Sequence, residues 1–216
     1  MFYDPRRNDH NLPHNPWTAL VVPRPIGWIS TVSKTGVVNL APYSFFNTVS
    51  AHPPLVLFSS HPRKHSQINA EETGEFVANL ATWDLREVMN ASSAEFGPGI
   101  SEPDRVGIEM ASCTNVRPPR VKLSPVVLEC KYNTTIKITH SDGRINPSGI
   151  VVGEVVGVHV DDAVIVDGHV DVTRMKPIAR LGYMDYAVVE ELFSMQRPGK
   201  PAEDAPEEAR GAKVPG

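Results

Sequence analysis

Two long strand-like segments near the middle of the chain constrain the fold more than any other feature. They read PVVLECKYNTTIKIT (residues 125–139) and GIVVGEVVGVHVDD (residues 149–162). In the second segment, β-branched residues share one face, whereas Gly153, Gly157 and His159 share the other. Glycine on one face of a strand often marks a bend, or the close approach of another backbone, where a sheet curls into a barrel. The pattern therefore predicts a mainly β barrel with two or three peripheral helices.

The spread of turn residues agrees with many short strands in one domain. Of 216 residues, 20 are proline and 15 are glycine, and they are scattered along the chain rather than concentrated in one linker. A chain of this length can bury one substantial core without disulfides or metals, so we predict a single domain over residues 1–197. Residues 198–216 contain no apolar side chain larger than valine and predict a flexible C-terminal tail.

Charge and cysteine content exclude several classes of protein. The net charge is −4, whereas a nucleic-acid-binding domain is usually strongly basic. Cys113 and Cys130 lack the spacing of a zinc site or a disulfide framework, so a reducing compartment is the simpler interpretation. Residues 1–17 lack the basic start and apolar run of a signal peptide, and no segment is long enough for a membrane helix. We expect a cytoplasmic protein that binds neither nucleic acid nor membrane.

Shorter segments predict the other elements. In RPIGWISTVSKTGVVNLAPYSFFN (residues 24–47), strand-like residues flank the turn SKTG and predict a hairpin. The apolar run PPLVLFSS (residues 53–60) predicts a central strand covered on both faces. KHSQINAEETG (residues 64–74) predicts a short surface helix that ends at Gly74. EFVANLA (residues 75–81) predicts an alternating strand, and TWDLREVMNASSAEF (residues 82–96) predicts a helix.

The segment that follows the hairpin is the first candidate site. Ser44 and Asn47 add side-chain donors and acceptors to the backbone amides, while Tyr43, Phe45 and Phe46 add flat apolar surface. Such a set suits a planar heterocycle with a polar edge, and loops on rigid scaffolds are where binding sites concentrate. A core corner whose turn residues are satisfied within the chain is the alternative, since most aromatic side chains serve packing.

The segment SSHPRKHS (residues 59–66) is the second candidate site, at the expected junction of a strand and a helix. Backbone amides, hydroxyls, two cations and the positive end of a helix dipole would meet there, as a phosphate dianion requires. A solvated helix start capped by Ser66 is the alternative. Because both candidate sites lie at ends of neighbouring predicted strands, together they favour a mononucleotide-like cofactor.

The sequence lacks several other common motifs. The G-x-G at residues 97–99 has Glu102 where a dinucleotide fingerprint needs its third glycine. Neither a Walker loop nor a G-x-S-x-G nucleophile motif is present. His10 and His14 have metal-compatible spacing, but nearby prolines argue against a rigid helical site, so we predict no metal.

These motifs, read in order with PIARLGYMDY (residues 177–186), resemble the flavin reductase-like, FMN-binding split-barrel family, especially its flavoredoxin-type members. The resemblance covers residues 12–195. It implies a homodimer of split β-barrels with FMN bound near the subunit interface. The positions that match flavin-ring and ribityl contacts are Ser30, Thr31, Ala41, Ser44, Phe46 and Asn47. The positions that match phosphate contacts are Ser59, Ser60, Lys64 and Ser66.

The resemblance implies an FMN-dependent oxidoreductase. It would act either as a flavin reductase that takes hydride from NADH or NADPH, or as a flavoredoxin-like electron carrier with a redox partner protein. FMN carries the redox chemistry, so no side chain is assigned as catalytic. Trp28 either lines the open face of the flavin or, as strand tryptophans more often do, packs in the core. A flavin-binding carrier or interaction module without turnover is the alternative function.

The chain departs from the family pattern at three points. His65 stands where an aspartate is frequent, which alters the expected capping of the helix. Tyr183 stands where a second glycine is frequent, which predicts a pocket wall reshaped by its ring. Residues 146–148 read Asn-Pro-Ser where the short flavin reductases often carry Gly-Asp-His near the nicotinamide. The sequence therefore leaves the electron donor open.

Overall fold

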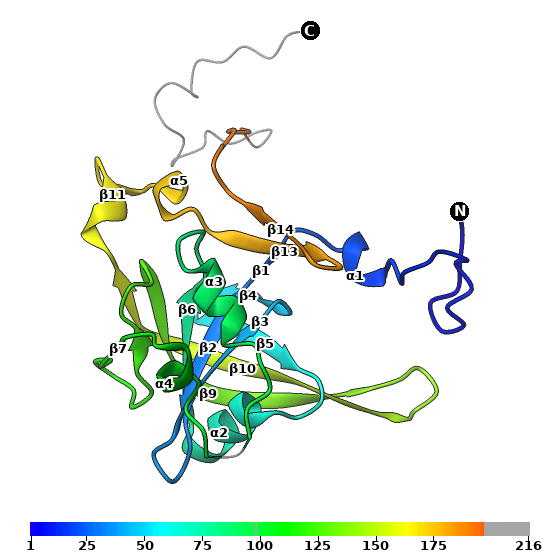
Figure 1. Cartoon of the computed structure of the whole chain (residues 1–216), viewed down its shortest axis with the longest axis horizontal. Helices are drawn as coiled ribbons and strands as arrows, with labels where there is room; N and C mark the ends of the chain where they lie inside the picture. The colour runs from blue at the N-terminus through cyan, green and yellow to red at the C-terminus, as the bar shows by residue number, and fades with distance from the viewer. Residues whose placement is uncertain (98, 197–216) are drawn as a thin grey trace, which may run out of the picture.

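Seven antiparallel strands form the main sheet of the computed structural model, which describes residues 1–97 and 99–196 (Figure 1). The prediction of a mainly β fold is confirmed. The strands are, in order across the sheet, β3 (Val38–Tyr43), β2 (Gly27–Val32), β6 (Glu75–Leu80), β9 (Val126–Thr139), β10 (Ile145–Val160), β5 (Pro54–Ser60) and β4 (Phe46–Ala51).

The sheet curls because its two edge strands are consecutive in the chain. β3 forms one edge and β4 the other, yet only Ser44 and Phe45 lie between them. The three Cα steps from Tyr43 to Phe46 span at most about 11 Å, so both edges must come together at this junction. The amide of Ser59 donates to the carbonyl oxygen of Phe45 at 2.8 Å and ties the junction to β5. The sheet therefore closes into a barrel with a seam at residues 44–45.

The two long predicted strands pair with each other as β9 and β10, and their hairpin extends beyond the rest of the sheet (Figure 1). A side chain at Gly153 would meet the ring of Phe76, and one at Gly157 would meet Asn115 and Glu129. The register of the pair shifts beside both glycines, as it does at β-bulges. The predicted close approach at the glycine face is confirmed.

Three smaller antiparallel sheets accompany the barrel. The largest has the order β1 (Arg24–Pro25), β13 (Ile178–Gly182) and β14 (Asp185–Val188). The other two pair β7 (Met110–Ala111) with β8 (Arg120–Val121), and β11 (Ile165–Val166) with β12 (His169–Val170). A short 3-10 helix, η1 (Asp162–Val164), precedes β11.

Five short α-helices lie in the described residues, rather than the predicted two or three. They are α1 (Trp17–Leu20), α2 (His65–Thr73), α3 (Arg86–Ala91), α4 (Glu102–Val106) and α5 (Val172–Met175). None of these helices is both long and apolar enough to cross a membrane. As predicted, α2 ends where Gly74 adopts a left-handed backbone, with φ of 76°, and its amide donates to the carbonyl oxygen of Ala70.

Two core clusters lie on opposite faces of β2, because successive side chains of a strand alternate. Ile29 belongs to the first cluster, which includes Phe58 and one residue of α2. Trp28 belongs to the second, which includes Met89 of α3 and one residue of β13. Trp28 is fully buried, and its Nε1 donates to Ser92 Oγ at 2.9 Å. Trp28 is therefore a core residue.

Four sequence predictions need correction. β5 lies second from an edge and buries only alternate residues, so it is not covered on both faces. β6 does not alternate, because its first five residues are all buried. The helix predicted over residues 82–96 is reduced to α3. The predicted surface helix α2 buries Gln67 and Asn69. The predicted tail at residues 198–216 lies outside the described residues.

Candidate functional site

The first candidate site spans the seam rather than forming a loop. Ala41 is in β3 and Asn47 in β4, so only two residues between them are outside strands. The ring of Phe46 packs against Gly27, where a side chain would overlap it. Asn47 is exposed, and its Oδ1 accepts from the amide of Thr48 at 2.8 Å. The half-exposed ring at the seam is therefore that of Phe45, which the resemblance did not single out.

Ser30 and Thr31 are fully buried, and partners within the chain engage both hydroxyls. Ser30 Oγ donates to the carbonyl oxygen of Pro119 at 2.5 Å. Thr31 Oγ1 accepts from Asn69 Nδ2 at 3.0 Å. The side chains of both predicted contact residues thus hold neighbouring segments in place. Neither residue lines the cavity described below.

Residues 59–66, called the phosphate cluster below, surround the start of α2. The helix begins at His65 with Lys64 as its N-cap residue, and no side chain caps it. Ser66 therefore lies inside the helix, which rules out the alternative that it is the N-cap. Lys64 Nζ lies 3.3 Å from Glu95 Oε1, and both side chains are exposed. Arg63 is instead held by Glu71, with its Nε 3.0 Å from Oε2.

The hydroxyls of Ser60 and Ser66 in the phosphate cluster lie inside the protein and have partners within the chain. Burial raises the pKa of the nearby Tyr43. Ser60 Oγ donates to the carbonyl oxygen of Pro62 at 2.9 Å. Ser66 Oγ lies 2.8 Å from the side-chain amide of Asn39. Ser59 and His65 are half-buried and Ser66 and Gln67 are buried, so Lys64 is an exposed donor of the cluster beside the uncapped start of α2.

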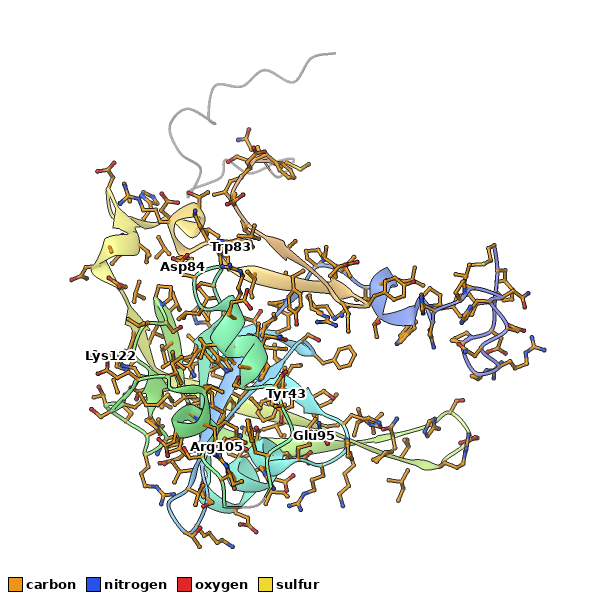
Figure 2. All side chains as sticks on the ribbon, viewed as in Figure 1. Tyr43, Trp83, Asp84, Glu95, Arg105 and Lys122 are labelled. Carbon is orange, nitrogen blue, oxygen red and sulfur yellow. The ribbon has the colours of Figure 1, made fainter. Side chains whose placement is uncertain are left out.

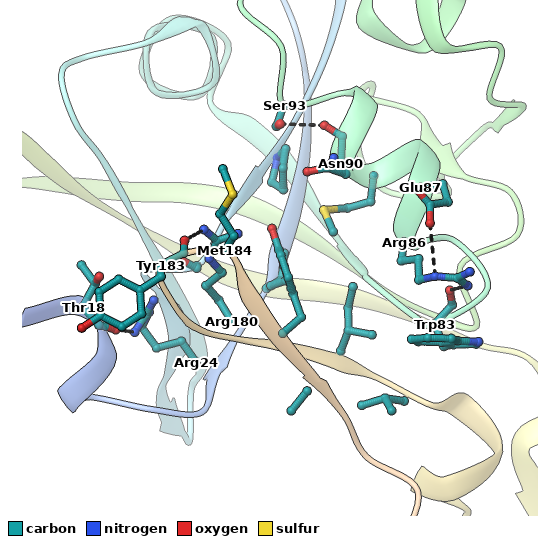
Figure 3. A pocket seen from close by; sticks show the side chains of 18 of the residues that line it. Thr18, Arg24, Trp83, Arg86, Glu87, Asn90, Ser93, Arg180, Tyr183 and Met184 are labelled. Carbon is teal, nitrogen blue, oxygen red and sulfur yellow. Dashed lines mark hydrogen bonds and ion pairs between the residues drawn. The ribbon is translucent and has the colours of Figure 1, made fainter. Parts of the chain in front are cut away.

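A cavity of about 840 Å³ opens on the other side of the seam (Figure 3). Of the residues that the resemblance matched to cofactor contacts, Ser44 alone lines it, and Phe45 of the first candidate site lines it as well. Ser93 also lines the cavity. It lies two residues before Glu95, whose side chain pairs with Lys64, so the segment after α3 connects the cavity to the phosphate cluster. The other lining residues come from α1, β1, the seam, α3, β13, β14 and their connections, and include Thr18, Arg24, Ile26, Phe45, Trp83, Arg86, Glu87, Asn90, Arg180, Tyr183, Met184 and Tyr186.

The cavity wall is rich in arginine and aromatic rings. Arg86 stacks over Trp83, with its Cζ 3.9 Å from the ring centroid, and Arg180 stacks over Tyr186 at 4.5 Å. Tyr183 lines the cavity, as its departure from the family pattern predicted. The sequence analysis did not assign the arginines to a site, because they lie in segments far apart in sequence.

A third group of possible metal ligands consists of Cys113, Glu129 of β9 and His159 of β10. Their ligand atoms lie within 4.8 Å of one another. Glu129 is fully buried. Its Oε1 accepts from the amide of Thr114 at 2.8 Å, and its Oε2 accepts from the amide of Asn115 at 2.6 Å. Oε1 also lies 2.5 Å from His159 Nε2. Burial and the nearby Glu129 charge raise the pKa of Cys113 to about 12. Because the Glu129 oxygens already accept hydrogen bonds and the Cys113 thiol stays protonated, this group suits a structural role.

A closed sheet with a seam, an uncapped helix beside it and a bordering cavity define the split-barrel class of fold. A Shewanella frigidimarina structure named for its split barrel domain superposes with a TM-score of 0.79 at 23% identity, over 91% of this chain and 99% of that chain. Residues 19–175 match the flavin reductase like domain, and the chain belongs to this family.

Relatives and solved structures agree with this assignment. An uncharacterized Deinococcus radiodurans protein is 37% identical over 177 residues, which cover 76% of this chain and 75% of that protein. Nitrilotriacetate monooxygenase component B from Bacillus cereus has 29% identity and a TM-score of 0.82, covering 90% of this chain and 98% of that chain. The 2-nitrobenzoate 2-nitroreductase of Pseudomonas fluorescens has 27% identity and a TM-score of 0.75, covering 88% and 92%.

Proposed function

We propose that this protein is an FMN-dependent oxidoreductase that binds FMN across the seam. The observation that carries the proposal is the uncapped start of α2, with the exposed Lys64 beside it, next to a cavity lined by Ser44. A helix start with free amides and a cation is a phosphate site, and a cavity of about 840 Å³ is large enough for a flat ring system. Membership of the flavin reductase-like family supports the same cofactor.

Each part of the site would have a separate task. Lys64 and the first amides of α2 would hold the phosphate, whereas Ser44, Asn47 and the seam amides would face the polar edge of the ring. The buried Ser60, Ser66 and Tyr43 would fix the position of those amides rather than contact the cofactor. When bound, FMN supplies the capacity to accept and pass on hydride or single electrons.

The electron donor distinguishes a reductase from a carrier. Residues 146–148 lie at the start of β10, in the projecting hairpin, and Ser148 Oγ lies 2.7 Å from His61 Nδ1. NADH or NADPH as the donor fits the family and the named activity of the Pseudomonas relative, a nitroreductase. A redox partner protein as donor or acceptor fits a flavoredoxin-like role. A cytoplasmic location stays a prediction that agrees with two free cysteines.

Anaerobic spectroscopy tests the proposal. The full chain is purified, its chromophore is identified by mass, and the FMN-loaded protein is mixed with NADH or NADPH while the flavin absorbance is followed. We expect bound FMN and rapid bleaching with at least one donor. Bound FMN without bleaching by either donor would favour the carrier or binding-module alternative. Failure to bind FMN at micromolar concentration would contradict the proposal itself.

We also propose a symmetric homodimer. Open strand edges and exposed apolar side chains gain from a partner. β4 is an edge strand in which Val49 is 51% exposed, and the projecting β9–β10 hairpin exposes Ile136 and Ile145 by 51% and 78%. Light scattering should return twice the mass of the chain at micromolar concentration. A monomer that still binds FMN tightly would contradict both the dimer and a cofactor site at its interface.

A further inference from the structure

Two arginines lie opposite each other on neighbouring strands of the cavity wall. Arg24 of β1 is paired in register with Arg180 of β13, and both line the cavity (Figure 3). Like charges directly opposite each other on a sheet are destabilising. Of the described lining residues, Glu87 is the one carboxylate, and it lies 3.4 Å from Arg86 Nε. No acidic side chain of the described cavity wall therefore neutralises the Arg24–Arg180 pair.

Arg24 is also buried without a full set of partners. Its side chain belongs to a residue that is 8% exposed, and its Nε has no hydrogen-bond partner among the described residues. Its Nη1 donates to the carbonyl oxygens of Thr18 and Val21, which holds the chain around α1. Those bonds account for one nitrogen only. Burial and the neighbouring Arg180 lower the pKa of Arg24, as expected for a guanidinium that lacks a counterion.

The same arginines lie against flat apolar surface. The Arg24 guanidinium carbon is 5.7 Å from the centroid of Phe45, and that of Arg180 is 4.5 Å from the centroid of Tyr186. A guanidinium fork matches two oxygens of one carboxylate or phosphate. A ring attached to that oxyanion would lie along the aromatic wall. Buried polar atoms without a partner also occur in His10, Gln67 and Arg120, but none of these residues lines the cavity.

We propose that the cavity binds an oxyanion joined to a flat ring, either directly or through a ribose, with the oxyanion held between Arg24 and Arg180 and the ring packed against Phe45 and Tyr186. Two sources supply that chemistry, an aromatic carboxylate or the phosphate of a nicotinamide nucleotide. Use of the ligand as a redox substrate rests on the proposed function, whereas its binding does not.

Calorimetric titration of the full chain, both as purified and loaded with FMN, tests this site with benzoate, with neutral benzamide of nearly the same shape, and with nicotinamide mononucleotide. We expect at least one of the two anions to bind, and benzamide to bind at least roughly tenfold more weakly than benzoate if benzoate is the ligand. Arg180→Gln should weaken the bound anion about tenfold or more, because it removes a charge-assisted hydrogen bond. Arg180→Lys should recover part of the loss.

Arg86→Gln is the matched control, since Arg86 lines the same cavity but is already paired with Glu87. Its effect should be less than about twofold. Benzoate binding that depends on Arg180 identifies an aromatic acid, and binding of the mononucleotide alone identifies a nucleotide phosphate. Equal binding of benzoate and benzamide with no mononucleotide binding, or equal losses for the two glutamine variants, would overturn the site. Absence of bound flavin in the purified chain would contradict the proposed function but would leave the anion-binding result unchanged.

Discussion

The phosphate cluster and the cavity satisfy their buried polar groups in opposite ways. In the cluster, the hydroxyls of Ser60 and Ser66 are fully buried and hydrogen-bonded within the chain. In the cavity, Arg24 is nearly as buried but keeps an unpartnered Nε and faces Arg180. The cluster is therefore fixed before any ligand arrives and offers amides and Lys64. The cavity retains positive charge that an outside group would neutralise. Figure 2 labels Tyr43 of β3 and Glu95, the partner of Lys64 in the cluster.

The core next to the cluster is closely packed, whereas the core next to the arginine pair borders the cavity. Substitutions in these two cores should have the largest predicted effects on the free energy of unfolding. Phe58 is fully buried below the cluster, with ring centroids 4.9 Å from Tyr43 and 5.4 Å from Phe76. Phe58→Ala should lower the free energy of unfolding by about 3–5 kcal/mol. Met89→Ala should cost less, near the lower end of roughly 2–5 kcal/mol, because Met89 already borders the cavity.

Denaturant unfolding of both variants, without added ligand, checks this prediction. Met89 is the matched control because it too is almost fully buried, at 1% exposure, but in the second core cluster. A loss for Met89→Ala equal to or larger than that for Phe58→Ala would contradict the claim that the cavity side is the looser of the two.

The next effect concerns the charge that the cluster offers. Lys64→Ala should weaken FMN by roughly 1.5–3 kcal/mol, or about one to two decades in affinity, and leave riboflavin almost unchanged because riboflavin lacks the phosphate. Arg63→Ala is the control, since Arg63 is engaged by Glu71. Asn47→Ala should weaken both ligands by similar factors because it addresses the ring. Fluorescence titration with both flavins measures all three variants, and an equal loss for riboflavin in Lys64→Ala would refute the phosphate assignment.

Local patterns predicted the parts of the fold that depend on neighbours in sequence. The glycine face of β10, the hairpin of β2 and β3, and the end of α2 at Gly74 each follow from residues within one or two turns or strands. The seam could not be predicted this way, because it depends on β3 and β4 lying at opposite edges of the same sheet.

The same limit applied to the site. The motif residues predicted a site at Lys64 and the start of α2, which lie together in sequence. The buried Ser66 hydroxyl is held by Asn39, which arrives from another strand, β3. The pairing of Arg24 with Arg180 joins β1 to β13, two strands that are far apart in sequence, so no periodicity or motif could reveal it. The contacts that could not be predicted are those that depend on pairing between segments far apart in sequence, rather than on residue type.

A smaller effect is expected at Glu102, a buried acid beside the cluster whose Oε2 accepts from the amide of Leu40 at 3.1 Å. Burial raises the pKa of Glu102. Its contribution to stability is therefore fully present below the unfolded pKa of about 4.5 and is lost as the pH rises through the folded pKa. Glu102→Gln should remove this decline, with a change no larger than about 1 kcal/mol at pH 7.

Unfolding of wild type and Glu102→Gln between pH 4 and pH 7, in steps of about half a unit, checks the sign. The stability of the variant relative to wild type should increase as the pH rises. Glu95→Gln, at an 88% exposed side chain, serves as the control and should show little dependence on pH. A wild type that gains stability relative to Glu102→Gln as the pH rises would contradict the assignment of Glu102 as an uncompensated buried acid.

The smallest effect on stability is expected at Tyr183, on the cavity side. Tyr183 has φ of 46°, in the left-handed region where glycine is favoured. Tyr183→Gly would relieve about 1–2 kcal/mol of backbone strain but lose roughly 0.5–1 kcal/mol to added chain entropy and some contact of a 47% exposed ring. The net change in unfolding free energy should stay within about 1 kcal/mol.

Lys176→Gly is the control, because Lys176 also has φ of 46° but does not line the cavity. Only Tyr183→Gly should widen the cavity and improve binding of 2-naphthoate relative to benzoate in calorimetric titration. An equal change in Lys176→Gly, or none in Tyr183→Gly, would mean that the Tyr183 ring does not form the wall that limits ligand size.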